Sequence, residues 1–192
     1  MDESAVKEHL KVFSRFNPIM KVWKSSYADS VRHHATPLEK TNWFFHQNSS
    51  FIYQQLPQEA LEIIKKHLEK APDGLKLELL ALGGQVSRIH PRQTAFPWCE
   101  SFHWLHLQGA WRDPYEANLL IDINEKLFIA LQPYLINPQT GTIRAYVNFH
   151  SFNVGDKYPQ AYWGDNYPRL QHIKRKYDPD NFFTTPQPII PK

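Results

Sequence analysis

One stretch of the sequence, Ser101–Trp111, carries residues that could do chemistry on one face of a β-strand. Successive side chains of a strand point to opposite faces. One face of this strand therefore carries Phe102, Trp104, His106 and Gln108. An imidazole changes its charge near neutral pH, so His106 is the candidate general base. The alternative is a histidine held by hydrogen bonds between the sheet and a helix, with no part in the chemistry.

A second group of candidates lies in residues 141–150, which have the composition of a further strand. Alternation puts Tyr146 and Asn148 on one face of it. Phe149 falls on the other face and has no hydroxyl group that could accept a proton. Asn148 could lie beside a ligand, or it could only bridge the ends of strands.

Three further candidates lie near the C-terminus. Tyr162 and Trp163 could form the wall of a substrate cleft, although packing in the core explains them equally well. Asn181 follows Asp178-Pro179 in a turn, where an asparagine tolerates tight backbone geometry and bonds nearby amides. That role is mainly structural.

The sequence does not indicate a metal site. His33 and His34 are adjacent, and on a helix neighbouring side chains point about 100 degrees apart, so the two rarely share one ion. We expect a solvated surface pair. Cys99 is the single cysteine, which excludes an internal disulfide and a multi-cysteine metal site and suits a reducing compartment.

The elements that position these residues follow from periodicity and helix caps. Helices are predicted over residues 3–15, from about 27, over 57–71 and over 113–131. The last of these should bury Leu120, Ile123, Leu127 and Leu131. Strands are predicted at 19–24, 49–55, 75–82, 101–111 and 141–150, with 75–82 as a central strand. This order indicates an α+β fold, a mostly antiparallel sheet covered by helices on one face, with a C-terminal helix and an extended tail.

Residues 161–183 combine an aromatic loop, a short helix and a helix stop. Gly164 breaks the extended aromatic run, and Asp165 or Asn166 can cap the helix that follows. The face of this helix predicted to pack on the core carries Leu170, Ile173 and Tyr177. Asp178-Pro179 then ends the helix, because a residue before proline is pushed out of the helical region.

The same stretch resembles a known family. The residues that carry the likeness are Tyr162-Trp163-Gly164, Asn166, Arg169-Leu170, Ile173-Lys174, Lys176-Tyr177-Asp178-Pro179 and Asn181-Phe182-Phe183. They resemble the C-terminal signature of the berberine-bridge-enzyme-like flavoproteins, FAD-linked oxidases of the vanillyl-alcohol-oxidase type. The likeness continues at 145–148 and 187–189, and landmarks such as Asn48–Ile52 and Leu82–Gly84 extend it over much of the chain.

The resemblance implies a division of the chain and a role for several residues. Residues 1–144 would be part of a substrate domain and residues 145–192 the berberine-like segment, together one compact unit. His106 occupies the place where relatives put a glutamate or glutamine that acts on the substrate. The flavin contacts that the likeness implies are Tyr146, Asn148 and Asn181. The implied substrate contacts are Gln108, Phe149, Tyr162 and Trp163.

The cofactor that the resemblance implies is FAD, yet these residues show nothing like its main binding half. FAD pyrophosphate is held by backbone N–H groups of a glycine-rich loop. Gly83-Gly84 is the only glycine pair and lacks such spacing, and Cys99 is in the wrong region to link a flavin. We therefore expect the chain alone to be inactive and to need a separate FAD-binding chain or to self-associate. The alternative is a stand-alone binding or interaction module that kept the fold and lost the flavin chemistry.

Composition narrows the class of partner. Hydrophobic residues at 42% and aromatic residues at 14% indicate a globular protein. The net charge of +3 is small and scattered, which argues against nucleic-acid binding. No apolar run approaches the roughly 20 residues that span a bilayer, and the first residues are charged. These features predict a cytoplasmic protein. The family resemblance implies a small-molecule substrate, and alcohols, sugars and alkaloid-like amines are all handled by relatives.

Overall fold

The computed structural model describes residues 3–17, 23–34 and 43–192. The chain divides into two units, Met1–Thr41 and Asn42–Lys192. The first contains helix α1 (Glu3–Leu10), the 3-10 helix η1 (Lys11–Phe16) and helix α2 (Tyr27–His34), as the periodicity predicted. Most of the strand predicted at 19–24, and the side chains of the two adjacent histidines, lie outside the described residues.

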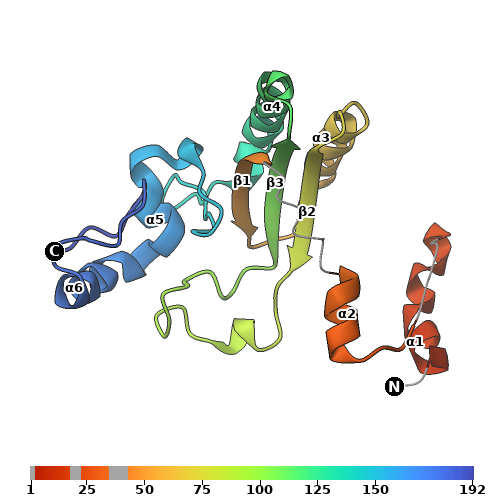
Figure 1. The fold of residues 1–192 in the computed structure, drawn as a ribbon, viewed down its shortest axis with the longest axis horizontal. Helices are drawn as coiled ribbons and strands as arrows, with labels where there is room; N and C mark the ends of the chain where they lie inside the picture. Colours follow the sequence, from red (N-terminus) through yellow and green to blue (C-terminus); the bar gives the residue numbers. More distant parts are fainter. Residues whose placement is uncertain (1–2, 18–22, 35–42) are drawn as a thin grey trace. The chain divides into compact units, whose positions relative to one another are not determined.

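The second unit is built on a three-stranded antiparallel sheet (Figure 1). Its strands are β1 (Phe44–Ile52), β2 (Leu75–Ala81) and β3 (His103–Trp111), in the order β1-β3-β2. The central strand is therefore β3, and the prediction that residues 75–82 form a central strand is wrong. Lys76 and Glu78 interrupt the apolar run of β2, which suits an edge strand with one side open to solvent.

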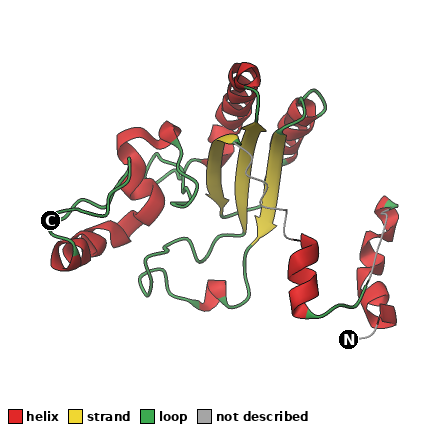
Figure 2. Ribbon diagram, viewed as in Figure 1, coloured by secondary structure: helices red, strands yellow, loops and turns green. Residues whose placement is uncertain are grey.

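Helices α3 (Gln58–Leu68) and α4 (Ala117–Leu135) pack on one side of this sheet (Figure 2). Leu105 and Leu107 of β3 are fully buried in the same core as Leu127 and Leu131 of α4. Burial of each such side chain is worth about 1.5–3 kcal/mol. The structure thus confirms an α+β fold with helices on one face of an antiparallel sheet.

Local signals start both helices. Pro57 precedes α3, and Asp113 caps the short 3-10 helix η3 (Pro114–Glu116) that leads into α4, accepting a hydrogen bond from the Tyr115 backbone N–H at 3.0 Å. The predicted buried stripe of α4 is confirmed except at Ile123, which is half-buried because Asn124 turns into the core beside it. The helix also continues past the predicted end to Leu135.

Residues 141–150 do not form the predicted strand. Their backbone bonds go to several different places: the Phe51 N–H donates to the Arg144 carbonyl at 2.6 Å, and the Ala145 N–H donates to the Ala161 carbonyl at 2.9 Å. The Tyr146 N–H donates to the Ser49 hydroxyl at 3.0 Å. Because a side chain takes this amide, a regular ladder along β1 cannot continue.

The C-terminal part is more helical than predicted. It contains 3-10 helix η4 (Phe152–Lys157), helix α5 (Tyr158–Trp163), 3-10 helix η5 (Gly164–Asn166), helix α6 (Tyr167–Tyr177) and an irregular tail. The aromatic run before Gly164 is therefore a helix and not an extended loop. Gly164 ends it with a φ of 48°, a value that favours glycine.

Helix α6 begins and ends where its caps predicted, but its packing differs. Asn166 precedes it and Asp178 follows it. Leu170 packs against the core, whereas Ile173 is 42% exposed and Tyr177 is 74% exposed, so the predicted inward stripe is limited to its first turns. No helix in the described ranges is both long and apolar enough to cross a membrane.

Candidate functional site

The face of β3 opposite α3 and α4 carries a stack of rings. The indole of Trp104 lies parallel to the imidazole of His106, with an interplanar angle of 7° and ring centroids 5.1 Å apart. The phenyl ring of Phe149 lies 4.3 Å from the imidazole and 5.1 Å from the indole. These contacts fix the plane of the imidazole.

His106 is held from both sides by polar groups of the neighbouring strands. Its Nδ1 lies 3.0 Å from Glu78 Oε2 on β2, and its Nε2 lies 3.3 Å from Gln47 Oε1 on β1. The residue is only 3% exposed. The hydrogen bonds of the alternative interpretation are thus present, with two strands and not a helix as partners, and the part of His106 in the chemistry stays a prediction. Gln108 lies next along the same face of the strand, as predicted.

The sequence reasoning missed Glu78. This glutamate is the direct strand partner of His106 in the β2–β3 register, and its side chain is 50% exposed. Alternation along residues 75–82 would have placed Lys76, Glu78 and Leu80 on one face, so a signal was present. It was overlooked because the segment was interpreted as an apolar central strand.

The loop at 145–149 brings all of its candidates to the sheet. Asn148 donates from Nδ2 to the Tyr146 hydroxyl at 2.8 Å, so these two lie together as predicted. Phe149 was placed on the opposite face, and this is wrong. A turn in which the Phe149 N–H bonds the Tyr146 carbonyl at 2.9 Å swings Phe149 back, and its ring lies 5.6 Å from that of Tyr146.

A cavity of about 520 Å³ adjoins this cluster. Its walls are Phe51, Leu82, Val86, Ala95, Phe96, Trp104, Ala145, Tyr146, Val147, Asn148, Tyr162 and Trp163. The volume is that of a pocket for a small organic ligand, and flat aromatic walls suit a planar or apolar one. Trp104, one of the walls, has its Nε1 buried without a hydrogen-bond partner.

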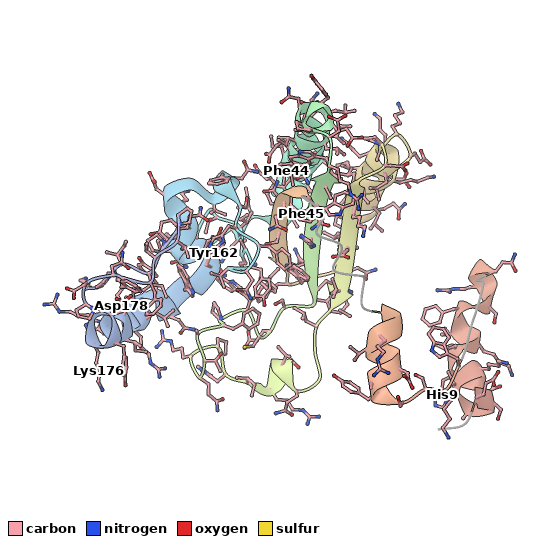
Figure 3. The ribbon with its side chains drawn as sticks, in the orientation of Figure 1. His9, Phe44, Phe45, Tyr162, Lys176 and Asp178 are labelled. Carbon is pink, nitrogen blue, oxygen red and sulfur yellow. The ribbon has the colours of Figure 1, made fainter. Side chains whose placement is uncertain are left out.

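Tyr162 and Trp163 are both cavity walls and core residues. Tyr162 (labelled in Figure 3) is 2% exposed, and its hydroxyl donates to Gln187 Oε1 at 2.6 Å and accepts from the Ser151 N–H at 3.0 Å. Burial raises the pKa of this hydroxyl, and the backbone hydrogen bond with Ser151 only partly opposes it. Tyr162 therefore stays a neutral phenol.

Asn181 is not among the residues that line this cavity. It has a φ of 53° in the turn after α6, and its backbone N–H donates to the Asp178 carbonyl at 3.2 Å. The structure thus describes Asn181 as a turn residue, which was the alternative left open by the sequence.

On the helix side of β1 lies a polar network that the sequence did not suggest. Its centre is Asn48, which is fully buried. The partners of its side chain are Asn124 Oδ1 at 2.9 Å, Glu125 Oε1 at 3.1 Å, Asn153 Nδ2 at 2.9 Å and the Ser151 hydroxyl. The network joins β1, α4 and the segment that follows the loop at 145–149, here called the Tyr146 loop.

Glu125 is the charged member of this network. Desolvation by burial raises the pKa of its carboxyl, but hydrogen bonds from His46, Asn153 and Asn48 outweigh it, so the pKa lies below its ordinary value. A lowered pKa means that the carboxylate contributes stability above the pKa of the unfolded chain. This stability is lost as the pH falls through the folded-state pKa.

The site fits one part of FAD better than another. The flat apolar walls of the cavity suit a planar ring. Gly83-Gly84 leads only into the three-residue 3-10 helix η2 (Val86–Arg88), and the described part of the chain offers no other glycine pair to cradle a pyrophosphate. Within the same ranges no three His, Cys, Asp or Glu side chains are grouped to hold a metal ion.

Comparisons with known proteins agree with this geometry. Residues 145–190 match the family model described as berberine and berberine like. An uncharacterised FAD-linked oxidoreductase of Bacillus subtilis, YgaK, is 32% identical over 146 residues, which are 76% of this chain and 31% of that protein. Berberine bridge enzyme-like 6 of Arabidopsis thaliana is 29% identical over 161 residues, 77% of this chain and 28% of that protein.

The fold is also found among solved structures. Berberine bridge enzyme from Eschscholzia californica superposes with a TM-score of 0.84 at 20% identity, over 100% of this chain and 44% of that chain. The chain thus spans 28% to 31% of the length of the two curated relatives above. These matches show that the chain belongs to the berberine-bridge-enzyme-like family of FAD-linked oxidoreductases.

Proposed function

We propose that the chain forms the substrate side of an FAD-dependent oxidoreductase. Residues 1–144 would then be part of the substrate domain and residues 145–192 the berberine-like segment. The observation that carries the proposal is the aromatic cavity of about 520 Å³ beside His106, on the open face of the sheet. A cytoplasmic location remains a prediction.

Each part of the site has work to do in this function. Bound FAD would supply the acceptor for a hydride from the substrate. The walls formed by Phe51, Phe96 and Trp104 would bind the apolar part of the substrate and exclude water. The polar groups around His106 lie on the same strand face as Trp104 and would hold the proton that the substrate releases.

Filling the cavity tests this function. Ala95 is an exposed residue of its wall, so Ala95→Trp should occupy the cavity without disturbing the core. In the flavin-loaded protein, meaning these residues together with an FAD-binding part, we expect KM to rise by about 10–200-fold. Flavin reduction by benzyl alcohol, N-methylbenzylamine or D-glucose, followed by stopped-flow absorbance, measures it.

Ala28→Trp is the matched control, because Ala28 is exposed on α2 and is not a wall of the cavity. It should leave KM unchanged. An unchanged KM in the Ala95 variant would contradict the proposal. Probes that bind wild-type protein with no flavin reduction would support the stand-alone binding module.

We further propose that the open face of the sheet is covered by the FAD-binding part of the enzyme or, when this chain is alone, by a second copy. Phe45 (labelled in Figure 3) is 55% exposed and Leu80 is 45% exposed, and each lies two residues from a polar partner of His106. Exposed apolar patches on a monomer commonly mark such interfaces.

Residues 1–192 alone should therefore bind a dye specific for apolar surface and self-associate. The double variant Phe45→Glu and Leu80→Glu should lower dye fluorescence severalfold while preserving the thermal unfolding midpoint, because neither side chain belongs to the core. Tyr115→Glu, at a 94% exposed aromatic outside this face, is the control. Light scattering that shows a monomer at high concentration, with no dye binding, would refute this expectation.

A further inference from the structure

His106 is poorly placed to meet a substrate itself. Its side chain is 4% exposed, and both ring nitrogens already face polar partners in the sheet. The ring cannot turn toward a ligand, because Trp104 lies parallel to it and Phe149 packs 4.3 Å from it.

Its partner Glu78 is placed in the opposite way. The side chain is 50% exposed on the open face, and only its Oε2 is bonded to the His106 ring. Oε1 has no bond among the described residues. Glu78 is not itself a wall of the cavity, but its strand partner His106 is the neighbour, along the same face of β3, of the wall residue Trp104. A carboxylate is an acceptor for protons from hydroxyl and amine groups, and a hydrogen-bonded imidazole behind it holds it in one orientation.

The surroundings leave Glu78 as the acceptor on this face. The strand residues facing the same side are Phe45, Gln47, Ser49 and Phe51 on β1, Trp104, Gln108 and Ala110 on β3, and Lys76 and Leu80 on β2. Of these only Lys76 carries a charge, and an ammonium group can donate a proton but cannot accept one. Gln47 lies on the far side of the imidazole; with hydrogen on Nδ1, the Gln47 amide must turn its N–H and not its oxygen toward Nε2.

We propose that Glu78 accepts the substrate proton and that His106 is its positioning residue. This rests on the function proposed above. The O–H or N–H bond of the substrate breaks, and its proton passes to Glu78 Oε1. FAD held by the FAD-binding part would supply the acceptor for the hydride of the adjacent carbon, so that a C=O or C=N bond would form as the substrate is oxidised.

The hydrogen bond between His106 and Glu78 can be measured on the chain without flavin. Long-range ¹H–¹⁵N spectra of labelled chain report which ring nitrogen of His106 carries hydrogen. We expect Nδ1, because Glu78 accepts from it. Glu78→Ala should release this constraint and move the hydrogen to Nε2. A wild-type ring with hydrogen only on Nε2 would overturn the proposal.

The proton-accepting role of Glu78 is tested in the flavin-loaded protein. The rate of flavin reduction is measured with whichever of benzyl alcohol, N-methylbenzylamine or D-glucose reacts. Glu78→Gln keeps an oxygen for the His106 N–H but cannot accept a proton, so the limiting rate should fall by about 10²–10⁴-fold. The half-saturating probe concentration should not change. Glu59→Gln, on an exposed glutamate of α3, is the control.

His106→Phe separates positioning from folding, because a phenyl ring preserves the stack with Trp104. It should lower the limiting rate less than Glu78→Gln does and leave half-saturation unchanged. A wild-type rate in Glu78→Gln would overturn the role of Glu78. A third outcome is also distinguishable: the spectra show hydrogen on Nδ1, but the chain takes up no flavin with any FAD-binding part. The hydrogen bond between His106 and Glu78 would then stand, while its catalytic use and the proposed function would both be rejected.

Discussion

Purified by themselves, residues 1–192 are expected to carry no flavin. The pyrophosphate of FAD is anionic and is normally bound by a cradle of backbone N–H groups. The only glycine pair here, Gly83-Gly84, has φ values of 150° and 57° and precedes a helix of three residues, too short to present such a cradle. The visible absorbance of the preparation, measured after dialysis against free FAD, checks this.

The matching experiment adds an FAD-binding part from a family member to the same residues. We expect flavin to be retained when the FAD-binding part is mixed with the folded chain. It should not be retained by the chain alone or by a mixture with denatured chain. This result would place the flavin ring, and not the pyrophosphate, on this side of the enzyme. A yellow preparation of residues 1–192 with flavin near one per chain would contradict the expectation, because it would mean that these residues also bind the pyrophosphate.

Asn48→Ala is expected to be the most destabilising single substitution of the polar network, by about 3–5 kcal/mol in the free energy of unfolding. The side chain is fully buried and bonds four others. Its removal leaves the buried Asn124 carbonyl oxygen and the buried Ser151 hydroxyl short of a partner. Urea unfolding followed by tryptophan fluorescence measures the loss.

Asn118→Ala is the matched control, since Asn118 is exposed at the beginning of α4. It should change the free energy of unfolding by no more than about 0.5 kcal/mol. If the two variants unfold at the same urea concentration, then the network contributes little and the segment after the Tyr146 loop is held by its apolar contacts alone.

The parts of the fold that were predictable are those with local causes. A proline or a capping aspartate starts α3 and α4 where the sequence placed them, and Asp178-Pro179 ends α6. These signals act within one turn of helix, so no knowledge of distant residues is needed. Alternation also placed Trp104 and His106 on one face of β3, because that strand is regular throughout.

The failures have long-range causes. Residues 141–150 have the composition of a strand, yet the Ser49 hydroxyl binds the Tyr146 amide and prevents a ladder. Strand composition reports how well side chains pack on a pleated surface and not which partner the backbone finds. The position of β2 at an edge likewise depends on pairing with β3, about 30 residues away, which its own sequence does not state.

The candidate site was predictable in part for the same reason. Its aromatic members and His106 could be found from one strand and one loop. Glu78 required the register between β2 and β3, in which it faces His106. The role of Asn148 at a flavin and those of Gln108 and Phe149 at a substrate come from the family likeness alone and stay predictions.

The Asn48 network also affects the order in which the sheet can fold while the protein is being synthesised. Asn48 and Ser151 are separated by 103 residues. A ribosome adds roughly 5–20 residues each second, so Asn48 waits for its partner on the order of 5–20 s after it has been made. During that interval the Asn48 side chain of β1 lacks its Ser151 partner. Helix α4, through Asn124, is the first element that can bond and cover it. The N-terminal strand of the sheet is thus completed last, by residues near the other end of the chain.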